Sequence, residues 1–134
     1  MLQEFFFRKT SWGIFVSIDV EEIPFVDTMQ YDVKITETIF LKLDWDSNPY
    51  KNEVLEWISK AIINTIEKIS IPNPICFHIT KLDFNECNFQ EEGFYYVMLE
   101  WLAKKYKFEL PQLNAYYDRE TNRYIFPSLP SNLA

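Results

Sequence analysis

An alternating stretch near the N-terminus places the strongest constraint on the fold. In residues 12–20, WGIFVSIDV, one face would carry Trp12, Ile14, Val16, Ile18 and Val20. The polar residues Ser17 and Asp19 fall on the opposite face. Successive side chains of a β-strand point to opposite faces, so the pattern predicts a strand with one buried face. The aromatic run at residues 4–7 is the neighbouring strand that we expect on its N-terminal side.

A second alternating stretch, residues 31–45, contains one residue that breaks its pattern. Its apolar positions are Tyr31, Val33, Ile35, Ile39, Leu41, Leu43 and Trp45. Glu37 falls on the same face, where an unpaired carboxylate is costly. We therefore expect either a bulge that turns Glu37 outward or a break that divides the stretch into two strands. The alternative hypothesis is a functional buried carboxylate.

The next predicted element is a long amphipathic helix. Asn48 suits the N-cap and Pro49 suits the first helical position. Apolar residues then follow a helical spacing from Val54 to Ile69, which forms one stripe. The prolines within residues 71–74 end this helix, because proline cannot continue it.

The remainder of the chain predicts a strand, a helix and a hairpin. Residues 75–84 are rich in β-branched and aromatic side chains, which is typical of a strand. Residues 89–107 repeat the helical spacing of apolar residues. Short strands at residues 115–117 and 123–126 flank a turn-forming segment.

This order of elements, β-β(-β)-α-β-α followed by a β-hairpin, favours an α+β fold. We expect a mainly antiparallel sheet with two helices on one face, arranged as a two-layer sandwich. The order resembles the ribosomal-protein-S5-like fold and the ferredoxin-like sandwich, and the former fits better because several strands precede the first helix. Both folds host many functions, so the resemblance implies an arrangement and no activity. Residues 1–127 should form one domain, with a loosely ordered tail at 128–134.

Charge and glycine content narrow the classes of function. The chain has 13 Lys and Arg against 20 Asp and Glu, a net charge of -7. Phosphate backbones and anionic lipids repel such a chain, so we expect no nucleic-acid or membrane partner and favour a basic protein. With only 2 glycines there is no glycine-rich phosphate loop. The N-terminus lacks a signal-peptide pattern and no apolar run approaches a membrane span, so we expect a cytoplasmic protein.

Residues 75–96 contain the thiols and the histidine that could carry chemistry. A zinc site could use Cys76, His78, Asp83 and Cys87. The chain has 1 His and no closely spaced cysteine pair, so we expect packing rather than a metal site, and no cofactor. A catalytic pair of Cys87 and His78 would need an orienting group and an oxyanion hole, and nothing marks the latter.

The segment NECNFQEEGFYY, residues 85–96, reads first as the start of a helix. Asn88 and Glu91 fit a capping box, and Glu92 would meet the positive end of the helix dipole. Gly93 is unfavourable inside a first helical turn. We therefore expect Gly93 to mark a close approach of the backbone to a neighbouring strand or to a ligand.

Acidic and aromatic residues predict a partner-binding surface that comprises Asp44, Asp46, Glu53, Glu86, Glu92, Tyr95 and Tyr96. The main hypothesis is a small acidic interaction protein without catalytic activity, in its sharpest form a toxin-neutralising immunity-type protein that blocks a basic enzyme. One alternative is a small-ligand-binding protein or enzyme with a pocket near His78, Glu37 and Gly93. The other is a homo-oligomeric subunit, such as a homodimer, in which the strand at residues 4–7 pairs edge to edge.

Overall fold

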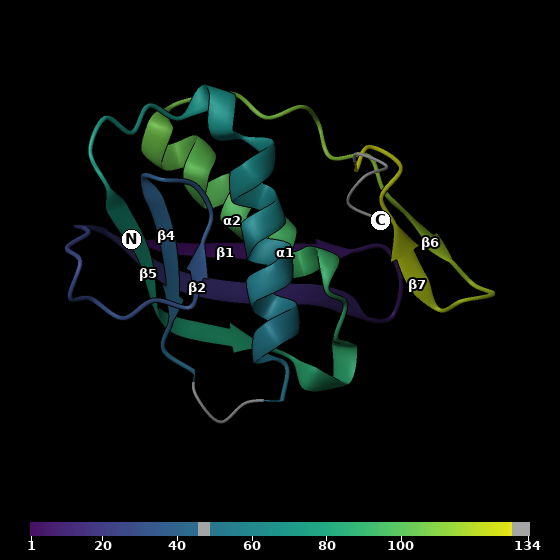
Figure 1. Cartoon of the computed structure of the whole chain (residues 1–134). Coiled ribbons are helices and arrows are strands. Elements are labelled where there is room, and N and C mark those ends of the chain that lie inside the picture. The colour runs from purple at the N-terminus through teal and green to yellow at the C-terminus, as the bar shows by residue number, and fades with distance from the viewer. Residues whose placement is uncertain (46–48, 130–134) are drawn as a thin grey trace.

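The computed structural model describes residues 1–45 and 49–129, and within them the fold is α+β, as predicted (Figure 1). The strands are β1 (Leu2–Arg8), β2 (Gly13–Pro24), β3 (Val33–Lys34), β4 (Ile39–Leu43), β5 (Ile75–Phe84), β6 (Tyr116–Asp118) and β7 (Arg123–Ile125). The α-helices are α1 (Lys51–Asn64) and α2 (Glu92–Tyr106), and two 3-10 turns are η1 (Ile66–Lys68) and η2 (Glu86–Asn88).

The main sheet has the strand order β1-β2-β5-β4-β3 and is mainly antiparallel. The pairs β1–β2, β2–β5 and β3–β4 are antiparallel, whereas β4 and β5 are parallel. Parallel neighbours need a crossover connection, and α1 supplies it between β4 and β5. The strands β6 and β7 form a separate two-stranded hairpin. The pairing of the N-terminal aromatic run with the alternating strand is therefore confirmed.

Both helices cover the same face of the main sheet (Figure 1). The side chains of β2 that face them are fully buried: Ile14, Val16, Ile18 and Val20. A register shift in the β2–β5 pairing lies between Asp19 and Val20, where Thr80 of β5 has no paired residue. β2 therefore keeps its alternation, and the inward side of β5 changes from Ile79 to Leu82. We call the opposite face of the sheet the open face; it carries Phe6, Phe15, Lys42 and His78.

Gly93 sets the distance between α2 and β2. A Cβ atom built at Gly93 would lie 2.7 Å from Cγ2 of Ile14 and 2.9 Å from Cγ2 of Val16. Such distances are far below ordinary carbon–carbon contact, so only glycine fits this position without a shift. The expected close approach to a strand is confirmed.

The break predicted in the second alternating stretch is confirmed. The chain turns between β3 and β4, and the Glu37 side chain at this turn is 90% exposed. Its carboxylate forms an ion pair with Lys34 at 3.1 Å. Glu37 is therefore a surface residue, and the hypothesis of a buried functional carboxylate at this position is wrong.

The predicted helix boundaries need correction. The first helix ends at Asn64 rather than Ile69, and Thr65 leads into η1. The second helix begins at Glu92, with no capping box. Asn88 belongs instead to η2, which Asn85 caps by accepting a 3.0 Å hydrogen bond from the Cys87 N–H. The proposed cap Asn48 and the proposed tail beyond Leu129 lie outside the described residues.

Candidate functional site

An aromatic cluster joins three chain segments at one end of the molecule, and it comprises Trp45, Tyr50, Phe84, Phe89 and Phe94. The ring centroids of Trp45 and Phe84 are 5.6 Å apart, and those of Tyr50 and Phe89 are 5.0 Å apart. Edge and offset ring contacts of this kind add to the free energy of area burial. They hold the end of β5 beside the start of α1, at the lower edge of Figure 1.

Four carboxylates lie within three residues, along the chain, of a ring of this aromatic cluster. We call them the acidic end: Asp44, Glu53, Asp83 and Glu86. Asp44 directly follows β4 and precedes Trp45. Asp83 lies at the end of β5 and precedes Phe84. The structure therefore brings three of the predicted partner-binding residues to one end of the molecule, although the predicted set left out Asp83. The predicted residue Asp46 lies outside the described residues.

Three of the four carboxylates at the acidic end have no ion-pair partner among the described residues. Asp83 and Glu86 are exposed and Glu53 is half-buried. With the described residues, none of these three carboxylates forms an ion pair. Asp44 differs, because its Oδ2 lies 2.8 Å from Nε2 of His78. The result is a concentration of negative charge beside the aromatic cluster.

His78 lies on the open face, in the middle of β5. Its neighbours across the two adjacent strands are Glu21 and Lys42. Gly93 is buried against the opposite face of the sheet, and Glu37 is exposed at the turn before β4. The structure does not bring these three predicted pocket residues together, because alternation along β5 points His78 away from the helices.

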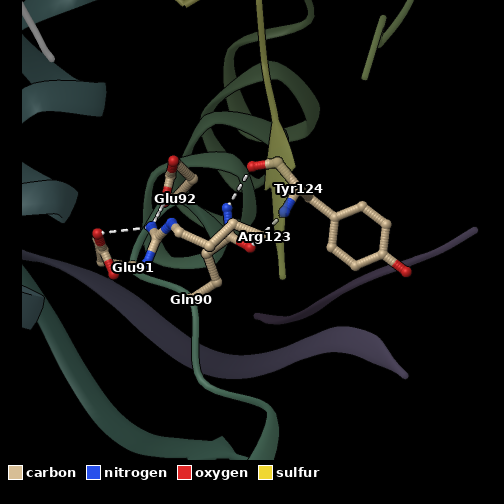
Figure 2. Close-up of polar contacts among 5 residues, drawn as sticks. All are labelled: Gln90, Glu91, Glu92, Arg123 and Tyr124. Atoms are coloured by element: carbon tan, nitrogen blue, oxygen red, sulfur yellow. Dashed lines mark hydrogen bonds and ion pairs between the residues drawn. The ribbon is translucent and has the colours of Figure 1, made fainter. Parts of the chain in front are cut away.

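Glu92 contacts other residues of the same chain. It belongs to a group of five residues that we call the hairpin clamp: Gln90, Glu91, Glu92, Arg123 and Tyr124 (Figure 2). Arg123 Nη2 lies 2.8 Å from Glu91 Oε1 and 3.1 Å from Glu92 Oε1. The Glu92 side chain is only 16% exposed, and burial raises the pKa of its carboxyl. Glu92 therefore docks the β6–β7 hairpin, and its assignment to a partner-binding surface is corrected.

The clamp also contains a buried amide. Gln90 is 2% exposed, and its Nε2 donates to the Tyr124 carbonyl at 2.6 Å. Its Oε1 accepts from the Tyr124 N–H at 2.9 Å. Figure 2 shows these two bonds beside the paired carboxylates. A side-chain amide can thus extend a strand where no backbone neighbour is present, a role that sequence spacing gave no means of finding.

Tyr95 and Tyr96 lie inside the protein rather than on its surface. They are 2% and 8% exposed, and burial raises the pKa of both phenols. Both line a cavity of about 310 Å³, which we call the helix cavity, between the two helices and residues 108–113. Asn64 Nδ2 donates to the Tyr95 hydroxyl at 2.8 Å, and Tyr96 stacks on Phe5. Their prediction as surface contacts for a partner is therefore corrected.

The two thiols lie in different environments. Cys76 is fully buried, and burial raises the pKa of its thiol to about 11. Cys87 is exposed in η2. In the described parts of the chain, no three His, Cys, Asp or Glu side chains are grouped so that they could hold a metal ion.

Comparison with protein-family models, with curated proteins and with solved structures finds no match to this chain. Neither helix within residues 1–45 and 49–129 has the length and apolar character of a membrane span.

Proposed function

We propose that this protein binds a basic protein partner through the acidic end and performs no catalysis of its own. The observation that carries the proposal is that three chain segments place Glu53, Asp83 and Glu86 around one aromatic cluster, without ion pairs to the described residues. Exposed carboxylates are stable in water without an ion pair, so these groups remain accessible to a cationic protein. Unpaired acids beside an aromatic cluster suit a surface that a cationic partner completes.

The acidic end would act first on the rate of association. Its carboxylates are part of a net charge of -7, and the field of such a chain accelerates encounter with a positively charged protein. Trp45 is half-buried in the same region and offers an amphipathic ring beside the charges. In its sharpest form the proposal is an immunity-type protein that covers the cationic cleft of a toxin enzyme.

Charge reversal at the acidic end tests this proposal. A variant with Glu53→Lys, Asp83→Lys and Glu86→Lys should lose the partner that the unchanged protein retains from its native host. The matched control reverses three exposed acids elsewhere, Glu67→Lys, Glu109→Lys and Glu120→Lys, so that net charge changes equally. The control should retain the partner. Equal loss in both variants would mean that overall charge alone drives binding, and would overturn the assignment to the acidic end.

A second candidate function is the binding of a small amphipathic amine in the helix cavity. Its volume of about 310 Å³ lies at the lower end of the range for ligand pockets. Glu100 lines it, and burial raises the pKa of this carboxyl. Lys68 lines the same cavity, whereas Gln3, which donates from Nε2 to Glu100 at 3.3 Å, lies outside its lining. The Glu100 carboxyl at the cavity wall is an acceptor that suits an ammonium group.

Hexylamine and hexanol distinguish this second candidate from nonspecific apolar binding. Hexylamine should raise the melting temperature and hexanol should raise it much less. The Glu100→Gln variant should lose the response to the amine, whereas Glu67→Gln, which alters an exposed acid, should keep it. An equal response to both compounds, or an unchanged response in Glu100→Gln, would contradict this function.

A further inference from the structure

Strand β1 is an edge strand whose outward backbone groups can be identified. It is the first strand in the order β1-β2-β5-β4-β3. Met1 and Val20 exchange two backbone hydrogen bonds, of 2.6 and 3.1 Å. Antiparallel pairs alternate between bonded and non-bonded, so Gln3, Phe5 and Phe7 also direct their N–H and C=O groups to β2. The residues that direct theirs to the free edge are Leu2, Glu4, Phe6 and Arg8.

The same four residues present an exposed apolar and charged row on the open face. Leu2 is 55% exposed and Phe6 is 64% exposed, and both are large apolar side chains. Glu4 and Arg8 flank Phe6 and are exposed as well. The outward carbonyl of Glu4 accepts a 3.2 Å bond from Nε2 of Gln3, which an incoming N–H would replace. An edge strand with outward backbone groups and exposed apolar side chains is a template for another strand.

Only certain registers let a second copy of β1 satisfy this edge. The outward N–H and C=O groups of one strand must lie opposite the outward N–H and C=O groups of the other. Glu4, Phe6 and Arg8 of one copy must therefore lie opposite even-numbered β1 residues of the second copy. A two-fold axis at Phe6 sets Phe6 against Phe6 and Glu4 against Arg8 on both sides of the axis. An axis at Glu4 would set Glu4 against Glu4, and an axis at Phe5 would set Glu4 against Phe6. Directly opposite like charges destabilise a pair and opposite charges stabilise it.

We propose that β1 pairs antiparallel with β1 of a second copy of this chain, about a two-fold axis at Phe6. Two Glu4–Arg8 pairs and a Phe6–Phe6 contact fix the register, and the two sheets become one continuous sheet. The net charge of -7 on each copy opposes this weakly, because charges more than about 8 Å apart are screened at 0.15 M salt. The inference goes beyond the proposed function, since neither Glu4 nor Arg8 belongs to the acidic end.

Charge-reversed variants test both the dimer and its register. Sedimentation of the unchanged protein at 0.15 M salt should give twice the chain mass of 16.2 kDa. Glu4→Arg and Arg8→Glu should each weaken self-association by about tenfold or more, because each sets like charges opposite one another. An equimolar mixture of the two variants should form a heterodimer, since every Arg of one then faces a Glu of the other.

The control reverses a charge on the open face outside β1, in Lys81→Glu, and should leave the dimer unchanged. The double variant Glu4→Arg with Arg8→Glu should also dimerise like the unchanged protein. A heterodimer that forms when the two single variants are mixed shows that both variants are folded. A monomer at all concentrations, or single variants that dimerise as tightly as the unchanged protein, would overturn the proposal.

Discussion

Gly93 of α2 lies so close to Ile14 of β2 that a Cβ at position 93 would come within 2.7 Å of Ile14 Cγ2. Gly93→Ala should therefore destabilise the protein by about 1–3 kcal/mol, as overpacking of a core does. This outweighs the gain of about 1 kcal/mol that alanine gives in a helix. Urea unfolding measures the change.

The control for this prediction is the same substitution in an Ile14→Ala background. Removal of the Ile14 Cγ2 atom opens the space that the new methyl group needs, so Gly93→Ala should cost less there. An equal cost in both backgrounds would show that the contact with Ile14 is not the cause.

Gln90→Ala should release the β6–β7 hairpin. The substitution removes both bonds to the backbone of Tyr124 and leaves a buried N–H and a buried C=O without partners. We expect a loss of about 2–4 kcal/mol in the free energy of unfolding. Arg123→Gln should cost under about 1 kcal/mol, because the Arg123 side chain is 41% exposed. Similar losses in the two variants would contradict the larger role given to the amide.

The two cysteines should differ sharply in reactivity. The thiolate is the reacting form, and Cys76 is fully buried with a thiol pKa of about 11, whereas Cys87 is exposed. A disulfide reagent at pH 8 should therefore modify Cys87 within minutes and Cys76 only after unfolding in urea. Cys87→Ser should abolish the fast reaction. Rapid modification of Cys76 in the folded protein would contradict its burial.

Glu100 should make stability depend on pH. Burial raises the pKa of Glu100 above its ordinary value of 4.5, so the folded chain binds more protons than the unfolded chain between the two values. The free energy of unfolding should therefore fall as pH rises through this window. Glu100→Gln lacks this loss and should melt at a higher temperature than the unchanged protein at pH 7.

Melting temperatures at several pH values check this prediction. Below pH 4 the advantage of Glu100→Gln should disappear, because the carboxyl is then protonated in both states. The exposed residue Glu67 serves as the control, and Glu67→Gln should show no such dependence. If the unchanged protein instead becomes more stable relative to Glu100→Gln as pH rises, the raised pKa of Glu100 is contradicted.

Local patterns in the sequence predicted the helices and strands. Contacts between distant segments decided the start of the second helix and the pairing of the strands. The strand at residues 75–84 has the predicted bounds because β-branched and aromatic residues fill it. The capping box failed because Glu91 pairs with Arg123, which lies on a distant hairpin. The parallel pairing of β4 with β5 likewise has no local signal.

The candidate site was predictable only in part. Acids near predicted element ends marked Asp44, Glu53 and Glu86, since such positions are polar and surface-directed. Their gathering at one end depends on contacts between rings from separate segments, such as Trp45 and Phe84. Tyr95 and Tyr96 were expected at the surface, but the crossing of residues 108–113 over the helices encloses them.

The association rate of the captured partner tests the central claim most directly. The partner should be purified and its binding measured at two salt concentrations with three proteins: the unchanged chain, the acidic-end variant and the matched control. The account predicts a rate for the acidic-end variant at least tenfold below that of the control at low salt, with the difference shrinking at high salt. Equal rates for the acidic-end variant and the control at low salt would contradict it.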